Sequence, residues 1–223
     1  MNRSALVSTT LTAALLFLGA CNQGARIGGS SVDAASNPWF AATAANDSKA
    51  LEAAAASGAD VNAHESRDYN TPLHVAASVG NAETVRILLA KGANADAVDE
   101  DSRTPLMIAC HRANTAAALA LTEAKANFDA RDRQNQTALM FAARNGNLDV
   151  VRALIAKGAT LDITRTDGST AMHLAAREGH ADIVRALKEG GASTTFRDSR
   201  GRTAQDVANA ARRPEVVKVL ESQ

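Results

Sequence analysis

One seven-residue motif recurs along the chain at a constant interval and constrains the fold more than any other feature. It reads Thr-Pro-Leu-His-Val-Ala-Ala where it begins at Thr71, and edited copies begin at Thr104, Thr137, Thr170 and Thr203. Each copy starts 33 residues after the previous one, without an insertion. A fixed period of about 20–50 residues is typical of solenoids, in which stacked units bury a shared core. We therefore predict an unbroken array of repeats forming one folded domain.

The period and two short motifs resemble the ankyrin repeat. The motifs are Thr-Pro-Leu-His-x-Ala-Ala at 71–77 and Lys-Gly-Ala at 91–93 and 157–159. The resemblance implies an all-α solenoid of about six helix-turn-helix units with extended hairpin loops. In this register the units are an N-terminal cap at 38–70, full repeats at 71–103, 104–136, 137–169 and 170–202, and a C-terminal cap at 203–223.

Each unit is expected to begin with a helix of about eight residues. Gly80, Gly146 and Gly179 then supply the left-handed backbone that reverses the chain into a second helix. The first unit is expected to keep the 33-residue spacing and to begin at Asn37-Pro38, with Asn as the N-cap. Its Trp39 is expected either to pack in the core or to shield the end of the stack.

The unit at 104–136 departs most from the others. Arg112-Ala113-Asn114 replaces the glycine turn, and Lys125 stands where Gly92 and Gly158 stand. Two explanations are open: a weak point in the stack, which we favour, or a face reshaped for a partner.

The N-terminus predicts export and lipidation. Residues 1–20 carry Arg3 and then an apolar stretch too short to span a bilayer comfortably, which is typical of a signal peptide. Leu18-Gly19-Ala20-Cys21 resembles a bacterial lipobox, which implies a lipid on Cys21. The alternative is an ordinary cleaved signal with a chance cysteine. Residues 21–37 are expected to be a lipidated, flexible tether, and Asn22 favours the outer membrane. We predict a periplasmic, lipid-anchored protein.

The sequence favours a binding protein over an enzyme. Lys plus Arg and Asp plus Glu are equal at 24 each, so the net charge does not indicate a nucleic-acid partner. We find no catalytic motif and expect no cofactor, metal or small-molecule substrate. By resemblance, His74 and His173 make structural hydrogen bonds, and Cys110 is expected to be a buried small residue.

The resemblance further implies that a partner binds the concave face, formed by the loop tips and the exposed ends of the first helices. Carried over by register, the candidate residues are Arg67, Tyr69, Arg103, His111, Arg112, Arg131, Arg133, Arg144, Asn145, Arg177, Glu178 and Arg200. Arginine predominates, which suggests a partner with an acidic patch. The alternative is that arginine is only a soluble choice at exposed positions.

Three roles remain open for the free monomer that we expect. It could inhibit a periplasmic or secreted protein, as an immunity protein does. It could support an oxidative-stress enzyme such as catalase, as similar periplasmic ankyrin proteins do. It could also be an envelope scaffold that binds lipopolysaccharide or other anions.

Overall fold

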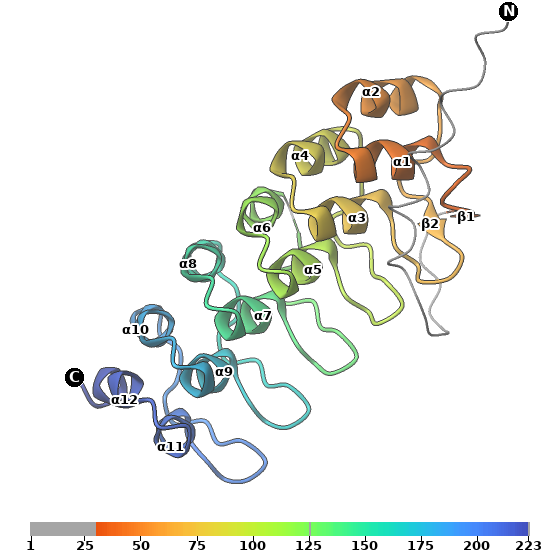
Figure 1. Cartoon of the computed structure of the whole chain (residues 1–223). Helices are drawn as coiled ribbons and strands as arrows, with labels where there is room; N and C mark the ends of the chain where they lie inside the picture. Colours follow the sequence, from red (N-terminus) through yellow and green to blue (C-terminus); the bar gives the residue numbers. More distant parts are fainter. Residues whose placement is uncertain (1–29, 125, 223) are drawn as a thin grey trace, which may run out of the picture.

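The computed structural model describes residues 30–124 and 126–222, and within them twelve helices form two layers (Figure 1). The inner layer lies beside the projecting loops and consists of α1 (Pro38–Ala45), α3 (Pro72–Val79), α5 (Pro105–His111), α7 (Ala138–Arg144), α9 (Ala171–Glu178) and α11 (Ala204–Ala210). The outer layer consists of α2 (Ser48–Ala56), α4 (Ala82–Ala90), α6 (Thr115–Thr122), α8 (Leu148–Ala156), α10 (Ala181–Glu189) and α12 (Pro214–Glu221). The predicted all-α solenoid is confirmed.

The repeated threonine starts each inner helix for a local reason. Thr104 Oγ1 accepts a hydrogen bond from the Met107 amide at 3.3 Å, and Pro105 follows it at the first helical position, where no amide is needed. Outer helices begin in the same manner: Asn81 Oδ1 accepts from the amides of Glu83 and Thr84. Polar caps therefore set the helix boundaries at a fixed period.

The core runs between the layers as a continuous apolar seam. Leu73, Leu88 and Leu154 are fully buried, and burying such a side chain stabilises by about 1.5–3 kcal/mol. Alanines such as Ala76 and Ala143 are equally buried, which lets neighbouring helices approach closely. Cys110 is also inaccessible, as predicted. Within the described residues, no helix combines the length and the apolarity needed to cross a bilayer.

The first unit corrects the expected spacing. Pro38 and Pro72 begin equivalent helices but lie 34 residues apart, because the first loop is one residue longer than the others. The Glu65 amide bonds the carbonyl of Asn70, five residues on, whereas Asp99 bonds Arg103, four residues on. Trp39 is 2% exposed and donates from Nε1 to the Ala59 carbonyl at 2.9 Å, so it packs in the core.

The segment expected to be a tether is ordered at its C-terminal end. Strand β1 (Ser31–Val32) pairs in parallel with β2 (His64–Glu65), and Asn37 caps α1 as predicted. Residues 30–37 are therefore part of the folded unit, since backbone hydrogen bonds that composition does not reveal hold them to the first loop. The signal segment, Cys21, the start of the tether and Lys125 lie outside the described residues.

At three of the turns after inner helices, a side chain from the following repeat clamps the turn. Asn114 Nδ2 donates to the Ser78 carbonyl at 2.8 Å, and His180 and Arg213 make equivalent bonds to the carbonyls of Arg144 and Arg177. The turn residue beneath each clamp is glycine with positive φ, and a Cβ there would come within 2.9 Å of the clamp. Glycine is thus required both for the backbone angle and for the close approach.

The repeat at 104–136 has a different contact in place of this clamp. Ala113 adopts the same left-handed turn, with φ of 58°, but carries a Cβ. Asn147, at the clamp position, bonds Thr115 Oγ1 instead. Asn145 then bonds the carbonyls of Cys110 and His111, each at 2.9 Å. The departure in sequence is therefore matched by a substitute contact in the same place.

Candidate functional site

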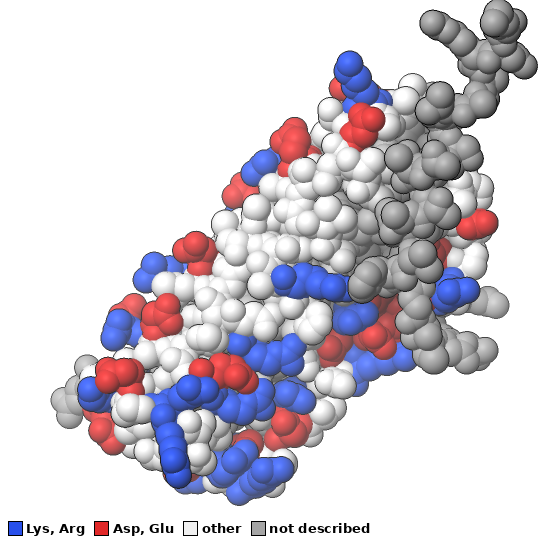
Figure 2. Space-filling model, viewed as in Figure 1, with Lys and Arg blue, Asp and Glu red and all other residues white. Residues whose placement is uncertain are grey.

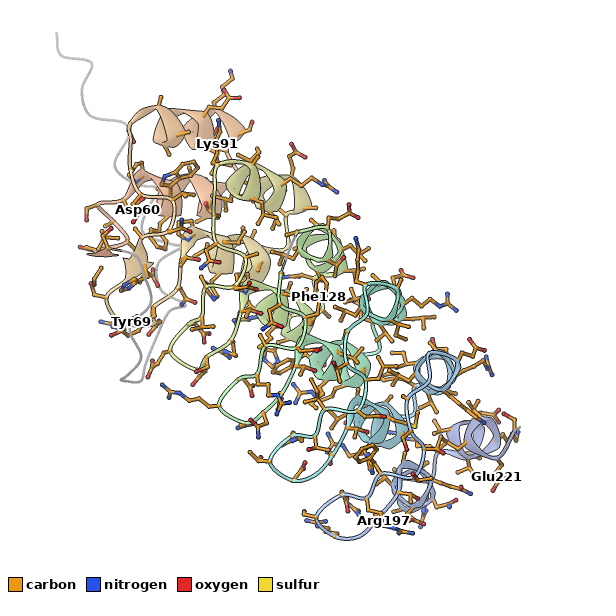
Figure 3. The ribbon with its side chains drawn as sticks, turned by 180° about the vertical axis from the view of Figure 1, so that it is seen from behind. Asp60, Tyr69, Lys91, Phe128, Arg197 and Glu221 are labelled. Carbon is orange, nitrogen blue, oxygen red and sulfur yellow. The ribbon has the colours of Figure 1, made fainter. Side chains whose placement is uncertain are left out.

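The loops between units form a continuous hydrogen-bonded ladder along one side of the array. The amide of Glu100 bonds the Asp68 carbonyl, and Arg133, Thr166 and Ser199 make the same bond to the preceding loop. Tyr69 lies in the first loop and Arg197 in the last, so the row of tips runs between these labelled residues (Figure 3). Side chains on successive tips consequently share one surface.

A carboxylate stabilises three of the tips in the same way. Asp99, Asp132 and Asp198 each accept two backbone amides of their own loop through Oδ1, at 2.8–3.0 Å. Asp198 also receives a two-pronged contact from Arg202, at 2.9 and 2.7 Å. Burial of Asp198 by itself raises its pKa, but the hydrogen bonds from Arg202 and the amides hold the pKa at about 2.

Histidines join two inner helices to the following loops. Nδ1 of His74 accepts from the Thr71 amide, so Nε2 carries the proton and donates to the Arg103 carbonyl at 3.0 Å. His173 makes the same two contacts, with Thr170 and with the Arg202 carbonyl. The burial of His74 lowers its pKa, which is consistent with a neutral, structural ring. The structural role expected for both histidines is confirmed.

A family model described as ankyrin repeats (3 copies) matches residues 39–132, 92–167 and 139–222. The chain belongs to the ankyrin-repeat family. No curated protein matches it. Ankyrin repeats are protein–protein interaction modules, and the family generally acts as a non-enzymatic scaffold. The surface to consider in this ankyrin protein is therefore the concave face predicted from the sequence.

Two titratable groups, Cys110 and His64, are held by contacts within the folded chain. Burial raises the pKa of the Cys110 thiol to about 12, which leaves almost no thiolate at neutral pH. Tyr69 stacks on His64 with ring centroids 4.9 Å apart, which holds His64 against the first loop of the ankyrin array.

Across residues 30–124 and 126–222, no three His, Cys, Asp or Glu side chains are grouped so that they could hold a metal.

Basic side chains gather over the loops and inner helices in the C-terminal half of the array (Figure 2). Arg144 is central: Nη2 lies 3.2 Å from His111 Nδ1, and the guanidinium lies 5.3 Å from the centroid of Phe141. Burial lowers the pKa of Arg144, and the nearby cations Arg165 and Arg177 lower it further. Burial followed by neighbouring arginines also lowers the pKa of His111. Glu178 and Asp132 act on the pKa of Arg144 in the opposite direction, but each acts less strongly than Arg165 or Arg177.

Two of the predicted candidates before α7, Arg103 and Arg133, are paired with carboxylates. Arg103 Nη2 lies 2.8 Å from Asp99 and 3.2 Å from Asp101, and Arg133 lies 3.8 Å from Asp101. These tips carry compensated charge. Arg67 and Arg131 are exposed on the tips, and Arg112 is exposed at the turn after α5.

Some of the remaining candidates bond other residues of the chain, and one does not. The Asn145 side-chain amide donates to the Cys110 carbonyl, and Arg177 Nε donates to the neighbouring Glu178 at 3.0 Å. Arg200 lies on the last tip and has no side-chain partner among the described residues. Arg177 thus shares a pocket wall with Arg200 and lies close to Arg144.

Sequence reasoning missed Arg165. It stands at the tip position that aspartate holds in the loops beginning at Asp99, Asp132 and Asp198, so aligning the loops would have revealed a cation in place of a capping anion. Its Nε lies 3.2 Å from Asp167 Oδ1, but the N–H is not directed at that oxygen and is buried without an acceptor. Such unsatisfied donors are rare in folded proteins.

Proposed function

We propose that the chain is a lipid-anchored binding protein of a bacterial envelope, which holds a periplasmic or secreted protein against its arginine-bearing concave face. The ankyrin repeats supply the binding scaffold. The lipobox-like Leu18-Gly19-Ala20-Cys21 supports the anchor and the compartment.

The partner's chemistry follows from one observation: Arg144 lies on the concave face without a carboxylate partner. Among the described residues its direct contacts are with the rings of His111 and Phe141. The charges of Arg165 and Arg177 oppose its own more strongly than those of Glu178 or Asp132 favour it. A cation kept half-buried in this way gains most from an incoming anion, because the surrounding dielectric is lower than that of water. Arginine also pairs with carboxylates through two parallel hydrogen bonds, which favours an acidic patch on the partner.

The test is a crosslinked pull-down of the full chain from membranes, identified by mass spectrometry. We expect one protein enriched with the native chain and lost with the R144E/R177E variant, since both charges lie in the same column of the inner helices. The matched control is R152E/R185E, which makes the same charge change at exposed arginines of α8 and α10.

The outcomes separate the possibilities. Equal recovery with both double variants would show that the partner does not use the concave face, and the proposal would be wrong. If no protein is enriched and lipopolysaccharide binding falls steeply with salt, the anion-scaffold role is favoured. Once a partner is known, its activity with and without the chain distinguishes an inhibitor from a supporting protein of the kind expected for catalase.

A further inference from the structure

A pocket lies between the last two loop tips and the inner helices α9 and α11. Its volume is about 280 Å³, and its walls include Ser169, His173, Arg177, Ser199, Arg200 and Arg202. Pockets for drug-sized ligands measure about 300–1,000 Å³. This pocket therefore suits one side chain with its water better than it suits a metabolite.

Two of the three arginines in the pocket wall are available to a ligand. Arg202 is already committed to Asp198, with Nη2 at 2.7 Å and Nε at 2.9 Å. Within the described residues, the one ion pair of Arg177 is with the neighbouring Glu178, and ion pairs that solvent reaches contribute little. Arg200 has no side-chain partner within the described part of the chain. Arg177 and Arg200 can thus turn to an incoming anion at small cost.

The rim of the pocket nearest α7 points to the same ligand charge. Arg165 adjoins the pocket through Asp167 and leaves a buried Nε–H without an acceptor. Arg165 and Arg177 each lie close enough to Arg144 for their charges to oppose the charge of its guanidinium. An anion placed near these guanidiniums would relieve this repulsion.

The pocket wall also limits how much negative charge can enter. Asp167 and Asp198 both line it, and Asp198 is held ionised by Arg202. Two fixed carboxylates repel a dianion such as a phosphate monoester more than they repel a single negative charge. The chemistry therefore fits a carboxylate.

We infer that this pocket is a subsite for one acidic side chain of the protein partner, an aspartate or glutamate held between Arg177 and Arg200, with Arg165 at its rim. The inference rests on the proposed function, because it assigns part of the acidic patch to a definite place. It locates specificity in the last two loops rather than along the whole array.

The test uses dye-labelled peptides in which three consecutive glutamates are flanked by Gly and Ser, with binding to the full chain followed by fluorescence anisotropy. We expect R177Q and R200Q each to weaken binding about tenfold, since each removes a charge-assisted contact. R165Q should weaken it less. The matched control, R185Q on α10, should bind as the native chain does, and melting curves verify that all variants are folded.

Three results would overturn the inference. They are a glutamine version of the peptide that binds equally well, a phosphoserine version that binds more tightly, and R177Q and R200Q variants that leave the affinity unchanged. The pull-down remains a separate measurement. If R144E/R177E loses the partner while R200Q does not affect the glutamate peptide, the concave-face function stands and the subsite is wrong. If R200Q abolishes peptide binding but neither double variant loses the partner, the pocket exists and the partner binds elsewhere.

Discussion

The repeats at 104–136 and 170–202 share one fold but are held to their neighbours by different contacts. In the repeat at 170–202, His173 bonds the next loop, Gly179 forms the turn and Asp198 pairs with an arginine. The repeat at 104–136 has Met107 in place of the histidine and Ala113 in place of the glycine.

The difference lies in stacking and not in the core. Ala117, Ala118 and Leu121 of the divergent repeat are fully buried, as Ile183 and Leu187 are in the regular one. The turn at Ala113 is strained, but Asn145 restores the lost contact from the following repeat. Departure from the repeat motif in the helices and turns therefore indicates exchanged stacking contacts, whereas the departure at Arg165 replaces a capping aspartate of a loop tip with a cation.

The largest expected effect comes from the tip carboxylates. D198N should reduce the free energy of unfolding by about 2 kcal/mol at neutral pH, because the Asp198 pKa of about 2 lies below the usual 3.8 and the side chain is only 4% exposed. A depressed pKa means that this stability is present above about pH 4 and is lost as the pH falls toward 2. Urea unfolding at neutral pH and at pH 3 measures both effects.

Its control is D132N, the equivalent change in the divergent repeat. Asp132 accepts the amides of Gln134 and Gln136 but, among the described residues, lacks the two-pronged arginine contact that Asp198 has, so the expected loss is about 1 kcal/mol. Equal losses for the two variants would contradict the contribution that we assign to Arg202.

An intermediate effect is expected at the helical turns. A113G should raise the free energy of unfolding by about 1 kcal/mol, since glycine adopts positive φ without a steric penalty. The mirror change, G179A, should lower it by about the same amount or more, because the new Cβ would lie 2.9 Å from Arg213 Cδ. Thermal unfolding measures both, and a stabilising G179A would refute the role given to the clamp.

The smallest effect is expected in the core. C110A places in the divergent repeat the alanine that Ala176 provides in the regular one, and it should change stability by less than about 1 kcal/mol. The native thiol should resist alkylation at neutral pH, because burial raises its pKa to about 12, and should react once urea unfolds the protein. Rapid labelling of the folded chain would contradict this burial.

The sequence predicts the array well because its period reflects local chemistry. Threonine caps, the glycine turns and the buried leucines are each fixed by neighbours within one unit or the next. The extra residue of the first loop was not predicted from the sequence. It lengthens only the turn that contains Tyr69 and Asn70, and the helices on either side resemble those of the other units. The pocket beside Arg177 also escaped it, because its walls come from two loops and two helices whose separation no motif records.

The short parallel pair of β1 and β2 has a consequence for how the array ends. A ladder of identical loops presents an open row of backbone donors and acceptors, on which another chain can add a further rung. Ser30 and Val32 occupy that row at the first loop, where their carbonyls accept the amides of His64 and Ser66. The segment before α1 thereby covers the exposed backbone edge of the first loop. A loop from another chain cannot add to the ladder of loops at that end.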